Sequence, residues 1–260
     1  MKTWQIAALA TAALFTAVGS QAQAADPLKA AVAADHRTVG NVARDAHRHP
    51  YETLSFFGIK PTDTVVELSP GGGWYTEILA PYLREAGQLY AAAGEGGRFK
   101  AKMDSMSVYS KVKLSVFDSN KGLLDIAPPG TADAVLTFRN VHNWMSQGPE
   151  KTQAVFNAAF KALKPGGVLG VEEHRLPASQ TQDPKAASGY VQEAVVIKFA
   201  EAAGFKLAGK SEVNANPKDT ADHPQGVWTL PPTLALKDKD RAKYQAIGES
   251  DRMTLKFVKP

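Results

Sequence analysis

The sequence predicts an α/β fold, and two observations lead to this prediction. Residues 64–68 are mostly β-branched or apolar, three glycines follow at 71–73, and apolar residues then recur at helical spacing from 78 to 83. This pattern is typical of a buried strand, a tight turn and a helix that packs on the sheet. Apolar strands and amphipathic helices also alternate through the rest of the chain, whose length suits one α/β domain of about 200–250 residues.

Residues 1–24 have the features of a cleaved secretory signal. Lys2 precedes an apolar run from Ile6 to Val18, and an Ala-x-Ala ending predicts cleavage after Ala24. An uncleaved membrane anchor is the alternative, but the run is shorter than the ~20 residues that span a bilayer. We therefore expect a periplasmic or secreted protein of a Gram-negative bacterium, with residues 25–260 as its single domain.

Composition narrows the possible partners. The chain has no cysteine, which excludes disulfides and a lipoprotein anchor. Its formal charge of +4 falls by one when Lys2 is removed with the leader, and so mild a positive balance does not favour a nucleic-acid partner. We expect no transmembrane segment after cleavage of the signal.

The turn after the first strand has an unusual spacing. Glu67 stands at the strand end, and Gly71 and Gly73 follow at the fourth and sixth positions after it. The turn lacks the Gly-Lys-Ser/Thr ending of a phosphate-binding loop, and it is not Gly-x-Gly-x-x-Gly. A helix that opens on such a turn presents unpaired N–H groups, which suit a nucleotide-like ligand. An ordinary tight turn is the alternative.

Polar residues crowd the ends of two later strands. Residues 139–144 follow the apolar segment 132–138, and residues 172–175 follow the segment 168–171. Side chains just beyond buried strands lie at the mouth of the ligand crevice in α/β proteins, and loops there often carry the chemistry. For His174 the alternative is a salt-bridged strand end.

These segments resemble the class I S-adenosylmethionine (SAM) dependent methyltransferases, and within them a bacterial group of exported predicted methyltransferases. The turn at 67–73 resembles motif I, acid-x-Gly-x-Gly-x-Gly, with Ser69 in place of the first glycine. Residues 133–136, Asp-Ala-Val-Leu, resemble motif IV. The Leu-Lys-Pro-Gly-Gly turn at 163–167 and the Ala-Gly-Phe turn before 206–213 also occur in the family's order.

The resemblance implies a Rossmann-like sheet of seven mostly parallel strands, with the last strand antiparallel and helices on both faces. Helices within about 26–57 would cap the site, and Tyr51 and residues 47–49 would reach the pocket or form a solvated helix end. Residues 214–248 would form an insertion between two antiparallel strands. The seven expected strands are 64–68, 87–93, 112–117, 132–138, 168–171, 206–213 and 253–258.

The resemblance also implies SAM as cofactor. Glu67 would organise the glycine turn, Glu95 would meet the ribose from a displaced position, and Asp118 would meet the adenine unless it only opens a turn. The residues that we expect to bind the cofactor are Glu67, Ser69, Pro70, Gly71, Gly73, Tyr75, Glu95, Asp118, Arg139 and Asn140.

The methyl acceptor would lie over Asn140, His142 and His174, which are the candidate catalytic residues. A histidine can take the acceptor's proton near neutral pH, so oxygen and nitrogen acceptors fit best. The sequence does not distinguish a small molecule from a lipid-like acceptor. No metal is expected, although His142, His174 and Glu173 could form a site if they converge.

Two other functions stay open. The first is a periplasmic binding protein that keeps the methyltransferase fold and has lost catalysis, because SAM is made in the cytoplasm and because Ser69 departs from the motif. The second is an NAD-dependent oxidoreductase, which the missing Gly-x-Gly-x-x-Gly spacing disfavours.

Overall fold

The computed structural model describes Met1 and residues 26–94 and 97–260. The predicted signal, apart from Met1, and Glu95 lie outside the described residues.

The core of the protein is a sheet of eight strands in the order β4-β3-β2-β1-β5-β6-β8-β7. Strands β3, β2, β1, β5 and β6 run parallel, and β8 pairs antiparallel with both β6 and β7. The predicted antiparallel last strand is thus confirmed. The strands are β1 (Thr64–Leu68), β2 (Gln88–Ala93), β3 (Lys113–Asp118), β4 (Leu123–Asp125), β5 (Ala132–Phe138), β6 (Leu163–His174), β7 (Lys206–Ser211) and β8 (Arg252–Val258).

The sheet has one strand more than predicted. Strand β4 is only three residues long and pairs antiparallel with the end of β3. The chain reverses between them through Gly122, whose φ of +71° places it in the left-handed region that favours glycine. Three residues are too few to show an alternating apolar pattern, so the sequence did not reveal this edge strand.

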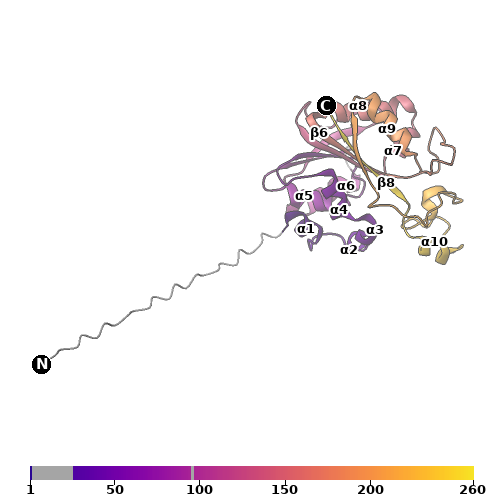
Figure 1. Cartoon of the computed structure of the whole chain (residues 1–260), viewed down its shortest axis with the longest axis horizontal. Coiled ribbons are helices and arrows are strands. Elements are labelled where there is room, and N and C mark those ends of the chain that lie inside the picture. The colour runs from indigo at the N-terminus through magenta and orange to yellow at the C-terminus, as the bar shows by residue number, and fades with distance from the viewer. Residues whose placement is uncertain (2–25, 95–96) are drawn as a thin grey trace.

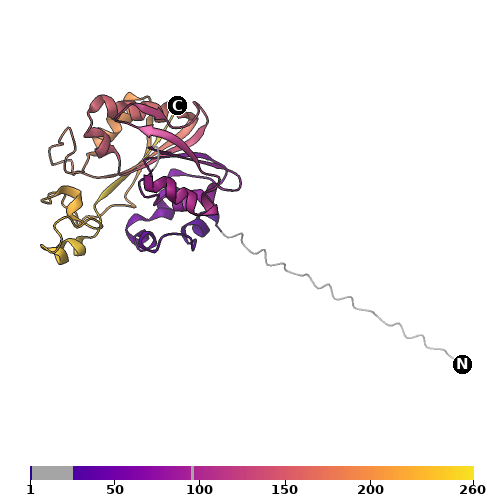
Figure 2. The same cartoon turned by 180° about the vertical axis from the view of Figure 1, so that it is seen from behind.

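Helices cover both faces of the sheet (Figures 1 and 2). Val65 and Leu136 pack with α1, α4 and α5 on one face, whereas Val66 and Val135 pack with α7, α8 and α9 on the other. Neighbouring residues of one strand point to opposite faces, so both must be apolar in a covered sheet. The helices are α1 (Pro27–Val32), α2 (Val39–Val42), α3 (Asp45–Arg48), α4 (Pro50–Phe57), α5 (Thr76–Leu83), α6 (Gly97–Ser105), α7 (Val141–Met145), α8 (Pro149–Ala162), α9 (Glu193–Ala202) and α10 (Arg241–Ile247), with short 3₁₀ turns η1 (Ser107–Tyr109) and η2 (Gly226–Thr229).

The strand order places a crevice at the centre of the sheet. β1 and β5 are neighbours, but the chain runs outward from β1 to β2 and β3 on one side, and from β5 to β6 on the other. Ligands of open α/β sheets bind at such a switch point, outside the carboxyl ends of the strands. The turns that follow β1 and β5 therefore define where a site can form.

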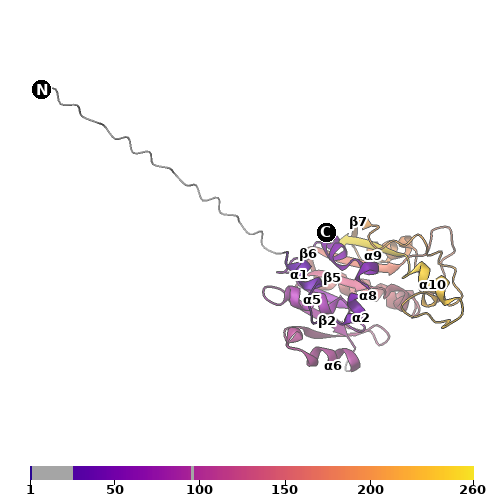
Figure 3. The same ribbon diagram turned by 90° about the horizontal axis from the view of Figure 1, so that it is seen from below.

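Two segments lie around this end of the sheet. Helices α1 to α4 precede β1, and the chain between β7 and β8, which includes η2 and α10, extends beyond the sheet (Figures 1 and 3). Among the described residues, none of the helices combines the length and the hydrophobicity that crossing a bilayer requires.

Candidate active site

The glycine turn after β1 presents an open backbone surface. Gly71 has a φ of +59°, and a Cβ atom built at Gly71 or Gly72 would meet no atom within 4 Å. Ser69 has a φ of +49°, in the region that glycine adopts most readily. The turn therefore keeps a glycine-like conformation at Ser69 and leaves room for a ligand against the backbone.

Ser69→Gly is expected to raise the free energy of unfolding by about 0.5–1 kcal/mol. The left-handed conformation costs an L-residue about 1–2 kcal/mol, which exceeds the about 0.5–1 kcal/mol of extra chain entropy that a glycine loses on folding. Urea denaturation measures the difference. Ser110→Gly is the control, because Ser110 has an ordinary φ of −60° and the same change there should destabilise. Equal destabilisation by both changes would contradict the argument.

Two side chains hold the glycine turn in place. The Asn140 amide donates to the carbonyls of Leu68 at 3.2 Å and Ser69 at 3.4 Å. Lys102 Nζ donates to the Gly72 carbonyl at 2.9 Å. Asn140 was predicted both to catalyse and to bind cofactor; its contacts in the structure are those of a positioning residue. The Pro70 carbonyl closes the turn by accepting from Gly73 N at 2.8 Å.

Glu67 and Tyr75 lie beneath the turn. Thr76 Oγ1 donates to Glu67 Oε2 at 2.5 Å, which ties β1 to the first residue of α5, and burial raises the pKa of Glu67 to about 7. The Tyr75 ring stacks on Phe138 with 3.5 Å between ring centroids. Tyr75 is 1% exposed. In the structure the Tyr75 ring therefore packs in the core, and its predicted contact with the cofactor stays a prediction.

At the far side of the crevice, Asp118 stabilises the reversal into β4. Its carboxylate lies 3.3 Å from Lys121 Nζ and accepts from Lys121 N at 3.2 Å, and these contacts lower its pKa. This is the turn-opening role that was the alternative in the sequence. A cavity of about 270 Å³ lies nearby, between the end of β2, α6 and β3, and is lined by Ala93, Gly94, Phe99, Lys100, Leu114, Ser115 and Val116.

The two candidate histidines lie side by side. His142 is in the first turn of α7, and its Nδ1 lies 3.0 Å from Glu173 Oε1. Its backbone N–H donates to the other carboxylate oxygen at 3.2 Å. His174, at the end of β6, has its ring centroid 5.4 Å from that of His142, and its Nδ1 lies 2.6 Å from Ser250 Oγ. Glu173, fully buried, thus orients the His142 ring.

His142, Glu173 and His174 form a cluster with metal-like spacing. Each offers one ligand atom, and these atoms lie within 4.8 Å of one another. Burial, then His142 and the nearby arginines, Arg139 first, hold the pKa of His174 well below its usual value. The carboxylate of Glu173 favours a cation in this cluster, whereas the positive charges of these arginines oppose a divalent cation and favour an anion.

Arg139 begins the turn after β5 and contributes to this charge. Its φ is +60°, and its Nη1 donates to Glu172 Oε1 at 3.0 Å. The resemblance assigned Arg139 to the cofactor. In the structure its side chain turns instead toward β6, because Glu172 is fully buried there and needs a charged partner.

Trp228, in the segment between β7 and β8, packs against the ring of His142. Its ring lies edge-on to His142, with 6.0 Å between centroids, and its side chain is still 39% exposed. The sequence marked residues 214–248 as an insertion but gave no sign that one of its residues meets His142. Such a contact depends on the path of a long irregular loop.

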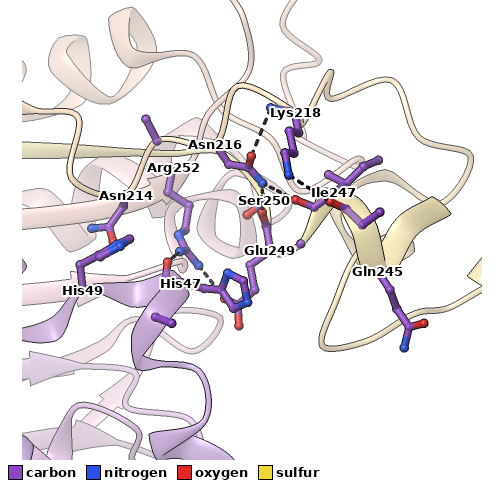
Figure 4. A pocket seen from close by; sticks show the side chains of 14 residues that line it. His47, His49, Asn214, Asn216, Lys218, Gln245, Ile247, Glu249, Ser250 and Arg252 are labelled. Carbon is purple, nitrogen blue, oxygen red and sulfur yellow. Dashed lines mark hydrogen bonds and ion pairs between the residues drawn. The ribbon is translucent and has the colours of Figure 1, made fainter. Parts of the chain in front are cut away.

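A second cavity, of about 270 Å³, shows how this segment is attached (Figure 4). Arg252 donates to the His47 carbonyl and, at 2.7 Å, to Glu249. The Asn216 amide donates to the carbonyls of Ile247 and Glu249 at 2.9 and 2.7 Å. His47 and His49 line this cavity, and the bond from Arg252 to the His47 carbonyl joins the N-terminal helices to the start of β8. Tyr51 instead donates to Asp26, which also precedes β1.

Comparison with solved structures decides the fold. A SAM-dependent methyltransferase from Aquifex aeolicus superposes with a TM-score of 0.54 and 20% identity, over 73% of this chain and 93% of that one. The chain has a methyltransferase fold. The glycopeptide N-methyltransferase MtfA, complexed with S-adenosyl-L-homocysteine (SAH), matches this fold with a TM-score of 0.53 and 12% identity, over 83% of this chain and 90% of that one.

The methyltransferase fold alone does not decide the reaction. The [4+2]-cyclase SpnF also superposes, with a TM-score of 0.57 and 16% identity, over 90% of this chain and 92% of that one. No protein-family model matches the chain, and no curated protein matches it. The residues of the site, and not the fold, therefore have to indicate the function.

Proposed function

We propose that the protein transfers a methyl group from SAM to an oxygen or nitrogen nucleophile, with His142 as the general base. The observation that carries this proposal is the buried carboxylate of Glu173, 3.0 Å from His142 Nδ1, beside an open glycine turn in a methyltransferase fold. SAM, when bound, supplies an electrophilic methyl group on a sulfonium centre.

The glycine turn fits the cofactor. The space around Gly71 and Gly72 is free of protein atoms within 4 Å of a built Cβ, so the methionine end of SAM can approach the backbone there. Asn140 and Lys102 hold this turn through its carbonyls. The resemblance assigns the ribose to Glu95, which lies outside the described residues, and the adenine to the end of β3, where Asp118 also holds the turn into β4.

His142 and Glu173 have different roles in removing the acceptor's proton. In the tautomer that donates from Nδ1 to the carboxylate, His142 keeps the lone pair of Nε2 for the acceptor's proton. The negative charge of Glu173 then stabilises the imidazolium that forms. His174 is a poorer candidate for the general base, because its lowered pKa makes it a weaker base than an ordinary histidine. In this proposal its imidazole is an uncharged polar group beside His142.

The proposed setting is the periplasm or the cell exterior, because residues 1–24 have the features of a secretory signal. The methyltransferase must then meet SAM outside the compartment where SAM is made.

Thermal unfolding of residues 25–260 with SAH tests the cofactor. A ligand at about a hundred times its dissociation constant adds ~2.7 kcal/mol to the free energy of unfolding, which for a domain of this size raises the midpoint by roughly 5–10 °C. We expect this shift with SAH and with SAM, and none with NAD as the control. No shift with SAH would contradict the proposal and leave a binding protein without catalysis.

A further inference from the structure

A cavity of about 180 Å³ lies directly beside His174. Four parts of the chain meet there: the N-terminal helices, the end of β5, the end of β6, and the segment between β7 and β8. We assign this cavity to the acceptor side of the crevice, because two of its lining residues, His174 and Trp228, pack against the ring of His142, the general base proposed above. The cavity is lined by Arg44, Arg48, Arg139, His174, Val227, Trp228, Pro231, Pro232, Thr233, Glu249 and Ser250.

Three arginines share one carboxylate in the wall of this cavity. Arg44 Nε lies 2.6 Å from Glu249, Arg48 Nε lies 3.0 Å from it, and Arg252 Nη1 lies 2.7 Å from it. Glu249 is 5% exposed. One carboxylate cannot neutralise three guanidinium groups, so positive charge is left over at this wall.

A second carboxylate only partly offsets the excess. Glu172 lies 3.0 Å from Arg139 Nη1 and 3.0 Å from Arg252 Nε. The four arginines of this group, Arg44, Arg48, Arg139 and Arg252, therefore face two carboxylates and carry a net charge of two positive units.

Most of this positive charge is shielded from solvent, since the side chains of Arg48 and Arg252 are 6% and 2% exposed, whereas that of Arg44 is 23% exposed. Arg44 Nη2 is buried and has no hydrogen-bond partner among the described residues. Burial, followed by repulsion from Arg139, lowers the pKa of Arg48 to about 9, which still leaves it charged at neutral pH. Buried charges are stable only when they are paired. The arrangement therefore suits an anion that enters the cavity.

Another part of the cavity wall is apolar. Val227, Trp228 and Pro231 from the segment between β7 and β8 line it, and Trp228 also meets the His142 ring. A ligand that fits both walls combines an anionic group, which the arginines would bind through charge-assisted hydrogen bonds, with a flat apolar body.

We propose that this cavity binds the methyl acceptor through a carboxylate or phosphate group, with the acceptor's apolar body against Trp228. This inference rests on the proposed function, since it assigns the cavity to the acceptor of that reaction. The carboxylate of SAM itself is the other possible source of the anion, and the experiment separates the two.

The test measures the binding of benzoate, benzamide and phenyl phosphate to the mature chain saturated with SAH. We expect calorimetry to detect benzoate or phenyl phosphate and to give benzamide, which is uncharged and similar in shape, at least about tenfold weaker binding. Arg44→Gln should weaken binding of the anion by about tenfold. Arg241→Gln, which removes an exposed arginine of α10 outside the cavity, should leave it unchanged.

Three results would overturn the inference. Benzamide could bind as well as both anions, or the two arginine variants could behave alike. SAH could displace the bound anion, which would assign the arginines to the carboxylate of the cofactor. A failure of the proposed function looks different: SAH then produces no binding heat, while the preference for anions persists in its absence and supports the anion site alone.

Discussion

His142→Ala is expected to lower kcat for methyl transfer by about 10²–10⁴-fold, because general-base catalysis contributes a factor of that size. The dissociation constant of SAH should change by less than about twofold, since the open glycine turn and not His142 faces the cofactor in the proposal. Initial rates with labelled SAM and a panel of hydroxy- and aminobenzoates measure the first quantity, and calorimetry measures the second.

His223→Ala is the matched control for this variant. His223 is also buried and also pairs with a carboxylate, Asp219, at 2.8 Å, but it lies outside the cavity beside His174. Each variant loses one histidine contact with a buried carboxylate, so the two should lose comparable stability, and only His142→Ala should lose turnover. A wild-type rate in His142→Ala would remove this residue from the mechanism.

Gly71→Leu is expected to weaken SAH binding by at least about 100-fold, which corresponds to about 2.7 kcal/mol. The leucine side chain would occupy the space that is open at Gly71, and its backbone would resist a φ of +59°. Calorimetric titration with SAH measures the loss.

Gly130→Leu separates the two causes. Gly130 has a φ of +67° and equally open surroundings, but it lies in the loop before β5, at the other end of that strand. It should incur the same backbone strain, so its midpoint of unfolding should fall as in Gly71→Leu while SAH binding stays as in the wild type. Undiminished SAH binding in Gly71→Leu would refute the assignment of the glycine turn.

Most strands could be predicted because they are buried on both faces. Five of the seven residues in 132–138 are apolar, and the structure has β5 at the same bounds; β1 likewise occupies 64–68. A parallel strand that is covered on both faces needs consecutive apolar residues, and such a run can be recognised in a short window of sequence. Strand β4 was not predicted, because it is short and lies at the edge of the sheet. Burial there does not require an alternating or continuous run of apolar residues.

The site could be predicted only in part. His142 and His174 became candidates because polar residues after buried strands are unusual, and the structure brings their rings together; their catalytic role stays a prediction. Arg44, Arg48 and Arg252 were not found as a group, because they lie on α2–α3 and β8, about 200 residues apart in the chain. Nothing in the local sequence of any one of them distinguishes it from a solvent-exposed arginine.

The sequence by itself determined the α/β class, the glycine turn and the two strand ends that hold the candidate histidines, because strand burial and turn geometry depend on neighbouring residues. Only the tertiary structure decided how those residues are used. It placed Glu173 against His142, turned Tyr75 into the core, and gathered four arginines around two carboxylates beside an apolar wall. These are contacts across long separations, and charge balance inside a fold is a property of the assembled site rather than of any segment.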